Sequence, residues 1–197
     1  VALRYDGRDG WVENVVNGDD EQELSDYTVR GTLVWDASET FDATLMYQRG
    51  DFNRDGRTSQ LSTCGAALRN FDPDGPGPAP AGALFGAISA AGEDCTANLS
   101  TNVVNVRNGQ PAVQQFDTET NTFGLTLNWQ VLGDHTLTSL TGYSDYETLD
   151  DFDVDFSFAQ IAGAEITEDY QQWSQEIRLT SPVSDNYDYI VGAFFQS

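Results

Sequence analysis

Oxygen-bearing side chains that could hold a metal ion follow one of the strand-like segments of this chain. Asp51, Asn53 and Asp55 stand at the first, third and fifth positions of a loop, the spacing that begins a calcium site. Gly56 follows, where such a loop turns sharply, but Ser62 occupies the twelfth position, where a bidentate Glu belongs. This calcium candidate therefore lacks its strongest ligand, and a Gly-containing turn that leaves a strand is the alternative.

Arginine and phenylalanine side chains in the same polar stretch could bind an anionic ligand. A guanidinium group pairs with a carboxylate in a planar two-bond geometry, and arginine and aromatic side chains often dominate binding surfaces. Arg30 and Arg178 lie instead on the polar faces of strand-like segments, where the alternative is an ion pair with Asp42 or Glu176. The predicted ligand contacts are Arg30, Phe52, Arg54, Arg57, Arg69, Phe71 and Arg178.

Two cysteines, Cys64 and Cys95, lie in the longest connection. In an outward-facing loop they would meet an oxidising compartment, and we expect them to form a disulfide, whereas an intracellular chain can carry two free thiols. The bridge would close a loop of about thirty residues and contribute about 3–4 kcal/mol on the chain-entropy model. A metal site at this pair is disfavoured, because the single histidine, His135, belongs to a different turn.

The composition excludes several functional classes. With one histidine, no Gly-x-Ser-x-Gly and no phosphate-binding loop, we expect no enzyme activity, no catalytic residues and no cofactor. The formal net charge is −23, which disfavours nucleic acid as a partner, because phosphate binding needs a basic surface. No apolar run is long enough for a transmembrane helix.

The elements that must position these residues are strands. Apolar and polar residues alternate with a period of two over 27–35, 41–48, 122–129, 172–179 and 187–195. Segment 136–146 alternates less cleanly, because Leu137, Leu140 and Tyr143 are spaced by three, and a bulge would restore its register. In the segment after it, Asp151, Asp153 and Asp155 are predicted to face water from a projecting strand.

The connections between the strands alternate between short and long. Short turns lie near 36–40, 131–135 and 181–186, and long polar connections span about 7–25, 51–117 and 150–168. Short turns on one side and long loops on the other are typical of outer-membrane barrels, although a soluble β-sandwich also shows period-two strands. Aromatic residues at the short-turn ends and strands of about 10–14 residues favour the barrel.

This pattern predicts an all-β fold of about seven antiparallel strands in sequential up-and-down order. The sheet should be open, with unpaired edges at 1–5 and 187–195. Both ends of the chain stop in strand-like segments, so we expect an internal piece of a larger barrel. The residues predicted to share the convex, lipid-facing surface are Val29, Leu33, Leu45, Leu125, Leu127, Trp173, Ile177 and Leu179.

Three segments resemble the TonB-dependent outer-membrane receptors. They are YTVRGTLVW at 27–35, LTSLTGYSDY at 137–146 and WSQEIRLTSP at 173–182, the last followed by VGAFF at 191–195. The resemblance rests on the order and spacing of these segments over most of the chain.

The resemblance implies that residues 1–197 are an open slice of a 22-stranded transmembrane barrel, without its plug domain, in the outer membrane of a Gram-negative bacterium. It implies import of a scarce ligand, in the first place a ferric siderophore, with oligosaccharides or cobalamin as further possibilities. The implied partners are outer-membrane lipid, the ligand and the TonB complex, which is contacted through the plug. The alternative is a non-transport β protein, such as a surface adhesin or a carbohydrate-binding sandwich.

Overall fold

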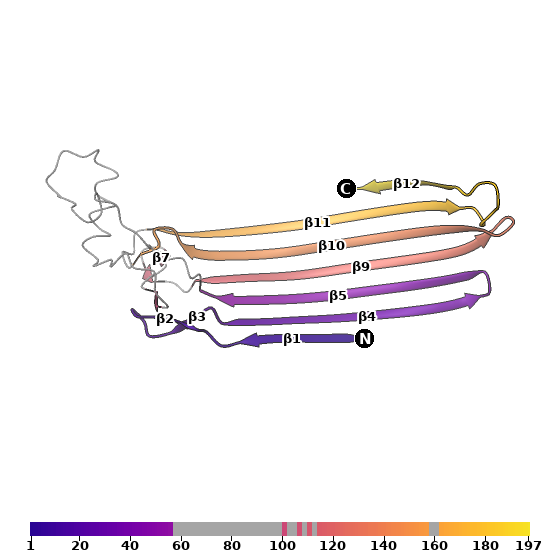
Figure 1. The fold of residues 1–197 in the computed structure, drawn as a ribbon. Helices are drawn as coiled ribbons and strands as arrows, with labels where there is room; N and C mark the ends of the chain where they lie inside the picture. The colour runs from indigo at the N-terminus through magenta and orange to yellow at the C-terminus, as the bar shows by residue number, and fades with distance from the viewer. Residues whose placement is uncertain (57–99, 102–105, 108–109, 112–113, 158–161) are drawn as a thin grey trace, which may run out of the picture.

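A seven-stranded antiparallel sheet forms the body of the structure, a computed structural model (Figure 1). The structure describes residues 1–56, 100–101, 106–107, 110–111, 114–157 and 162–197. The strands of the sheet are β1 (Ala2–Arg8), β4 (Leu24–Ser38), β5 (Phe41–Asp55), β9 (Gln115–Val131), β10 (His135–Asp153), β11 (Gly163–Thr180) and β12 (Ile190–Gln196). The short strands β2 (Val12–Asn14), β3 (Asp20–Glu21), β6 (Ser100–Thr101), β7 (Val106–Arg107) and β8 (Gln110–Pro111) form two small sheets.

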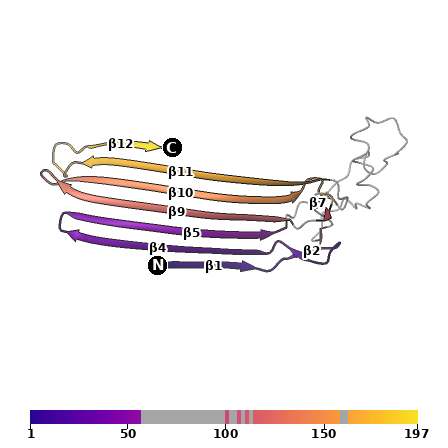
Figure 2. The ribbon, with the colours of Figure 1, turned by 180° about the vertical axis from the view of Figure 1, so that it is seen from behind.

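Each long strand pairs with its neighbours in the sequence, in the order β1-β4-β5-β9-β10-β11-β12. The predicted all-β meander of seven antiparallel strands is therefore confirmed, with β1 and β12 at its edges. Viewed from either side, the short turns lie together at one end of the sheet, and the strand ends that lead into the long connections lie at the other (Figures 1 and 2). No helix in the described ranges is long and apolar enough to cross a membrane.

The central strands run further toward the long connections than their apolar pattern predicted. Strands β4, β5, β9, β10 and β11 contain 15, 15, 17, 19 and 18 residues, against the expected 10–14. Residues 51–55 and 150–153, for example, belong to β5 and β10, not to loops. In these extensions the odd face is polar and the even face mixes Phe52 and Phe152 with charged residues, so the alternation fades while the hydrogen-bonded ladder continues. At the other end, β12 starts at Ile190, later than predicted.

The bulge predicted within 136–146 is absent. Strand β10 pairs with β9 and β11 without a register shift, and the one shift in the long strands lies between Asp36 and Ser38, at the β4–β5 turn. Leu140 therefore points to the face opposite Leu137 and Tyr143. The spacing of three reflects one leucine on the polar face.

Up to the register shift that sets Ser38 opposite Phe41, pairing places the odd-numbered residues of the seven strands on one surface and the even-numbered residues on the other. Residues directly opposite each other share a face, and Leu33 pairs with Leu45, which pairs with Leu125. Leu179 likewise pairs with Val191. We call these surfaces the odd face and the even face. The eight residues predicted to share one surface all lie on the odd face.

The described residues contain almost no apolar core. Val12, which is 4% exposed and lies outside the large sheet, is the one buried hydrophobic residue among them. On the odd face Leu33 and Trp35 are more than 60% exposed, and Leu125 and Leu127 are half-buried only by their neighbours within the sheet. The sheet thus exposes its apolar face, whereas the strands of a folded sandwich would cover it.

The apolar part of the odd face is a band bordered by aromatic rows. At the short-turn end Phe41 lies opposite Trp129 and makes an edge-on contact with Trp35 at 6.2 Å between ring centroids. Six residues further along, Phe123 lies in one row with Tyr47, Tyr143 and Trp173. We call the surface between these rows the apolar band; its odd-face members in β5, β9, β10 and β11 are Ala43, Leu45, Leu125, Leu127, Ser139, Thr141, Gln175 and Ile177.

Polar residues inside the band satisfy one another. The Thr141 hydroxyl donates to Gln175 Oε1 at 2.7 Å, and Gln175 Nε2 donates to Ser139 Oγ at 3.0 Å. The Gln175 amide also reaches the Glu176 carbonyl, at 3.0 Å. An amide with its donors and acceptor paired costs much less in an apolar environment than an unpaired one.

The even face is lined by small and hydroxyl-bearing side chains. Strand β9 presents Thr118, Thr120, Thr122, Gly124 and Thr126 to this face. Toward the short turns, the buried Thr138 hydroxyl donates to Asn128 Oδ1 at 2.9 Å, and the Asn128 amide donates to Asp42 at 2.9 Å. The sheet therefore has one apolar and one polar surface.

Candidate functional site

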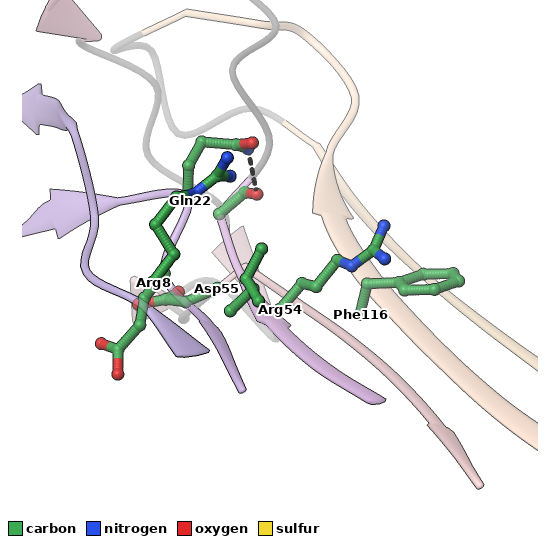
Figure 3. A pocket seen from close by; sticks show the side chains of 8 residues that line it. Arg8, Gln22, Arg54, Asp55 and Phe116 are labelled. Carbon is green, nitrogen blue, oxygen red and sulfur yellow. Dashed lines mark hydrogen bonds between the residues drawn. The ribbon is translucent and has the colours of Figure 1, made fainter. Parts of the chain in front are cut away.

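A pocket of about 440 Å³ opens at the long-connection end of the even face (Figure 3). Four of its residues form one row across four strands: Arg8 pairs with Leu24, Leu24 with Arg54, and Arg54 with Phe116. The chain at the adjacent strand ends completes the wall with Gln22, Glu23, Asp55 and Gly56.

The guanidinium groups in this pocket are weakly paired. Arg54 lies 3.9 Å from Asp26, a loose contact, and its side chain is about half exposed. Within the described ranges Arg8 makes no ion pair and is exposed. Two planar cations and the ring of Phe116 therefore offer charge-assisted hydrogen bonds and an aromatic contact to a small anionic ligand.

Carboxylates define the other side of the pocket. Burial raises the pKa of Asp55, and the negative charges of Glu23 and Asp19 raise it further. Gln22 closes the wall, because its amide donates to the Gly56 carbonyl at 2.7 Å (Figure 3). Gly56 has a φ of +70°, which lets the chain leave β5 in the left-handed region.

The structure brings only part of the predicted ligand set to this pocket. Arg54 lines it, and Phe52 lies on the same even face of β5, one row away. Arg30 lies opposite Gln48, which is six residues from Arg54 along β5, or about 20 Å. Arg30 donates to Gln48 at 2.7 Å. Arg178 lies near the short turns and contacts Glu176 at 3.4 Å, the wall pairing considered as its alternative.

Several predicted residues lie outside the described ranges. They are Arg57, Cys64, Arg69, Phe71 and Cys95, so both the disulfide and the ligand contacts of that stretch stay predictions. Arg8 and Phe116, by contrast, line the pocket but were not singled out from the sequence. Each stands in a segment assigned to a long connection, and only pairing through β4 and β5 brings them to one row.

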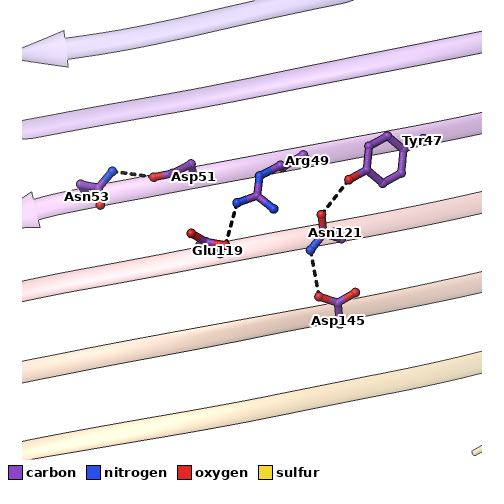
Figure 4. A network of polar contacts seen from close by, with 7 residues as sticks. All are labelled: Tyr47, Arg49, Asp51, Asn53, Glu119, Asn121 and Asp145. Atoms are coloured by element: carbon purple, nitrogen blue, oxygen red, sulfur yellow. Dashed lines mark hydrogen bonds and ion pairs between the residues drawn. The ribbon is translucent and has the colours of Figure 1, made fainter.

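The half calcium motif occupies extended chain. Asp51, Asn53 and Asp55 lie on the odd face of β5, where alternate side chains are about 6–7 Å apart, so they form a row. Asn53 donates to Asp51 at 2.6 Å within this row (Figure 4). No group of three histidine, cysteine, aspartate or glutamate side chains in the described part of the chain is arranged to hold a metal ion.

A polar network borders the apolar band on its long-connection side (Figure 4). The Tyr47 hydroxyl donates to Asn121 at 2.8 Å, and Asn121 donates to Asp145 at 3.0 Å. Arg49, which lies in the same row as Asn121, pairs with Glu119 at 2.7 Å. The odd face thus changes from apolar to charged within one or two rows.

The acidic run at the end of β10 differs from its prediction. Asp151 and Asp153 were expected to face water, but they are 4% and 1% exposed. Strand β10 ends at Asp153, and just beyond it the Val154 backbone N–H donates to the Ala162 carbonyl at 3.0 Å, where the chain returns toward β11. The expectation that Asp151 and Asp153 face water is therefore wrong. The sequence did not indicate the turn that follows the strand, because Phe156 stands where a glycine would have signalled it.

Comparison with known proteins adds no assignment to this geometry. No family model matches the chain, and no curated protein or solved structure matches it.

Proposed function

We propose that the seven strands are a segment of an outer-membrane β-barrel that belongs to a ligand-import receptor. The observation that carries this proposal is the exposed apolar band of the odd face, bordered by aromatic rows, in a sheet without an apolar core. Lipid meets the odd face, and the polar even face lines the barrel interior.

The free energy of apolar exposure supports a lipid surrounding. Burying one leucine or isoleucine side chain contributes about 1.5–3 kcal/mol, so leaving the three leucines and the isoleucine of the band partly in water forfeits several kcal/mol. A soluble protein would cover such a band with a second layer. A bilayer supplies the same apolar environment without one.

The dimensions of the band fit a membrane. From Trp129 to Phe123 the chain advances six residues, about 20 Å along the strand. A barrel strand tilted by about 40° converts this to about 15 Å of height, and the bordering rings extend it toward the apolar height of about 25 Å seen in such barrels. The remaining residues of β9 and β10 then project beyond the bilayer on the long-connection side.

The pocket supports import of a ligand from that side. Arg8 and Arg54 face the interior at the outer end of the strands, where an incoming anionic ligand first meets the barrel. A ferric siderophore with carboxylate or catecholate oxygens fits this chemistry. The sequence resemblance adds the rest of the proposal, which is a 22-stranded receptor driven by TonB through a plug domain.

Uptake by cells tests this function. Gram-negative cells that produce the protein should accumulate ⁵⁵Fe from its ferric siderophore, and the uptake should stop when TonB is deleted. Arg54→Gln should weaken uptake, whereas Arg178→Gln, which removes an arginine far from the pocket, serves as the matched control. Surface binding to glycans or host cells without any TonB-dependent uptake of ferric siderophores would replace this proposal with the adhesin alternative.

A further inference from the structure

Two neighbouring carboxyl groups lie where the chain leaves the end of β10. Asp153 is the last residue of β10 and is 1% exposed, and Asp155 follows two residues later. The two carboxyl groups lie within hydrogen-bonding reach of each other. Gln114 approaches from the start of β9, where its side-chain oxygen accepts the Asp153 backbone N–H at 3.4 Å.

One oxygen of this pair has no hydrogen-bond donor. Asp153 Oδ2 accepts the Phe156 backbone N–H, but Asp153 Oδ1 is buried without a partner. An unpaired buried carboxylate oxygen is costly, and proteins normally satisfy it with a proton, a donor or a metal ion. Either a proton shared with Asp155 or a bound cation would satisfy this oxygen.

The neighbouring oxygens suit a hard cation. The contacts of Asp155 include the Ser157 hydroxyl, which donates to its Oδ1, and the Ala162 backbone N–H, which donates to its Oδ2 at 3.2 Å. Ser157 is itself fully buried, so its oxygen is held beside the pair. Calcium binds carboxylates together with neutral hydroxyl, amide and carbonyl oxygens in a flexible arrangement.

We propose that a calcium ion binds between the carboxylates of Asp153 and Asp155, with Ser157 and Gln114 as nearby neutral oxygen donors. The proposal does not need a third carboxylate, which is consistent with the absence of a three-residue metal cluster in the described ranges. It is independent of the proposed transport function, since it concerns only how this turn is held.

The backbone supports the proposal in a second way. Asp151 and Asp153 lie in β10, and the chain leaves this strand through Asp155 and Phe156. Phe156 has a φ of +55°, the left-handed conformation that glycine would supply. A bulky residue rarely adopts this conformation, and such strain is retained where the surroundings require it.

The ionisation of the pair agrees with this arrangement. Burial raises the pKa of Asp153 to about 7, and the charge of Asp155 contributes to the rise. Near neutral pH a proton and a cation therefore compete for the same place.

Titration calorimetry on the purified protein in detergent micelles tests the site. After removal of divalent ions, calcium chloride is added at pH 8 to the wild type and to Asp153→Asn, Asp155→Asn and Asp169→Asn. Asp169→Asn is the matched control, because it removes one exposed carboxylate from β11, outside the turn. The wild type and Asp169→Asn should bind one ion with a Kd of about 10⁻⁴ M.

The two variants of the pair should bind at least about tenfold more weakly. Each variant is first checked for native β-sheet content by far-ultraviolet circular dichroism, and the two separate substitutions guard against misfolding of either one. Absence of calcium binding to the wild type at pH 8, or equal affinity in Asp153→Asn, would show that a shared proton satisfies the pair and would overturn the proposal. An equal loss in Asp169→Asn would show diffuse counterion binding and would overturn it too.

Discussion

Two variants that each place an arginine at the same depth of β9, one on each face, distinguish a lipid-facing sheet from a soluble one. Leu125 lies in the apolar band of the odd face, between Leu45 and Thr141. Thr126, the next residue, lies on the even face between Thr44 and Leu140. We predict that Leu125→Arg is strongly destabilising in a bilayer and that Thr126→Arg is tolerated.

The magnitude follows from depth. Leu125 is two residues from the row of Phe123 and four from Trp129, about 5 and 10 Å of height at a tilt of about 40°. It therefore lies within a few ångströms of the middle of the band. An arginine facing lipid at this depth costs about 2–4 kcal/mol, a factor of roughly 30 to 800 in the folding equilibrium, whereas an interior arginine remains in water.

Reversible denaturant unfolding in lipid vesicles measures both variants, with tryptophan fluorescence as the readout. The free energy of unfolding should fall by about 2–4 kcal/mol for Leu125→Arg and by less than about 1 kcal/mol for Thr126→Arg. Equal costs for the two variants, or a larger cost for Thr126→Arg, would refute the assignment of the faces.

Three further predictions concern named contacts. Arg54→Gln should weaken binding of an anionic ligand by about tenfold or more in equilibrium titrations, because it removes charge-assisted bonds worth about 1.5–3 kcal/mol, while Arg178→Gln leaves affinity unchanged. Without divalent ions, the free energy of unfolding should rise by up to about 1.4 kcal/mol per pH unit as the pH falls from about 7 toward 4. The reason is that Asp153 in the folded protein takes up its proton at a higher pH than in the unfolded chain. A wild-type pH profile identical to that of Asp153→Asn would contradict this. Tyr189→Phe should lower the free energy of unfolding by about 1 kcal/mol in the same assay, because it removes the 2.7 Å contact between the Tyr189 hydroxyl and His135 Nε2 at the short-turn end. An unchanged midpoint would show that the contact contributes nothing.

The apolar alternation was enough to predict the sheet. Where one face is apolar, as from Phe123 to Trp129, a period of two identifies the strand, its faces and its pairing with the next strand. Short turns then leave little choice of topology, because a chain that reverses within a few residues must pair with its neighbour. This is why strand order and the shared odd face were predicted correctly.

The long-connection end could not be predicted in the same way. There both faces of β5, β9 and β10 carry polar residues, so the pattern no longer distinguishes a strand from a loop. The row that joins Arg8 to Phe116 depends on the pairing of segments that lie 108 positions apart in the sequence. Asp153 likewise looked solvent-exposed because its cover depends on a turn at Phe156, a residue that seldom makes one.

Spin-label accessibility along β9 tests the central claim most directly. Single labels at positions 122 to 129, in the protein reconstituted into vesicles, are exposed in turn to oxygen, which concentrates in lipid, and to a water-soluble nickel chelate. Odd positions should be accessible to oxygen and even positions to the chelate, with a period of two. Chelate access to both faces, or oxygen access at the even positions, would contradict a membrane-spanning sheet.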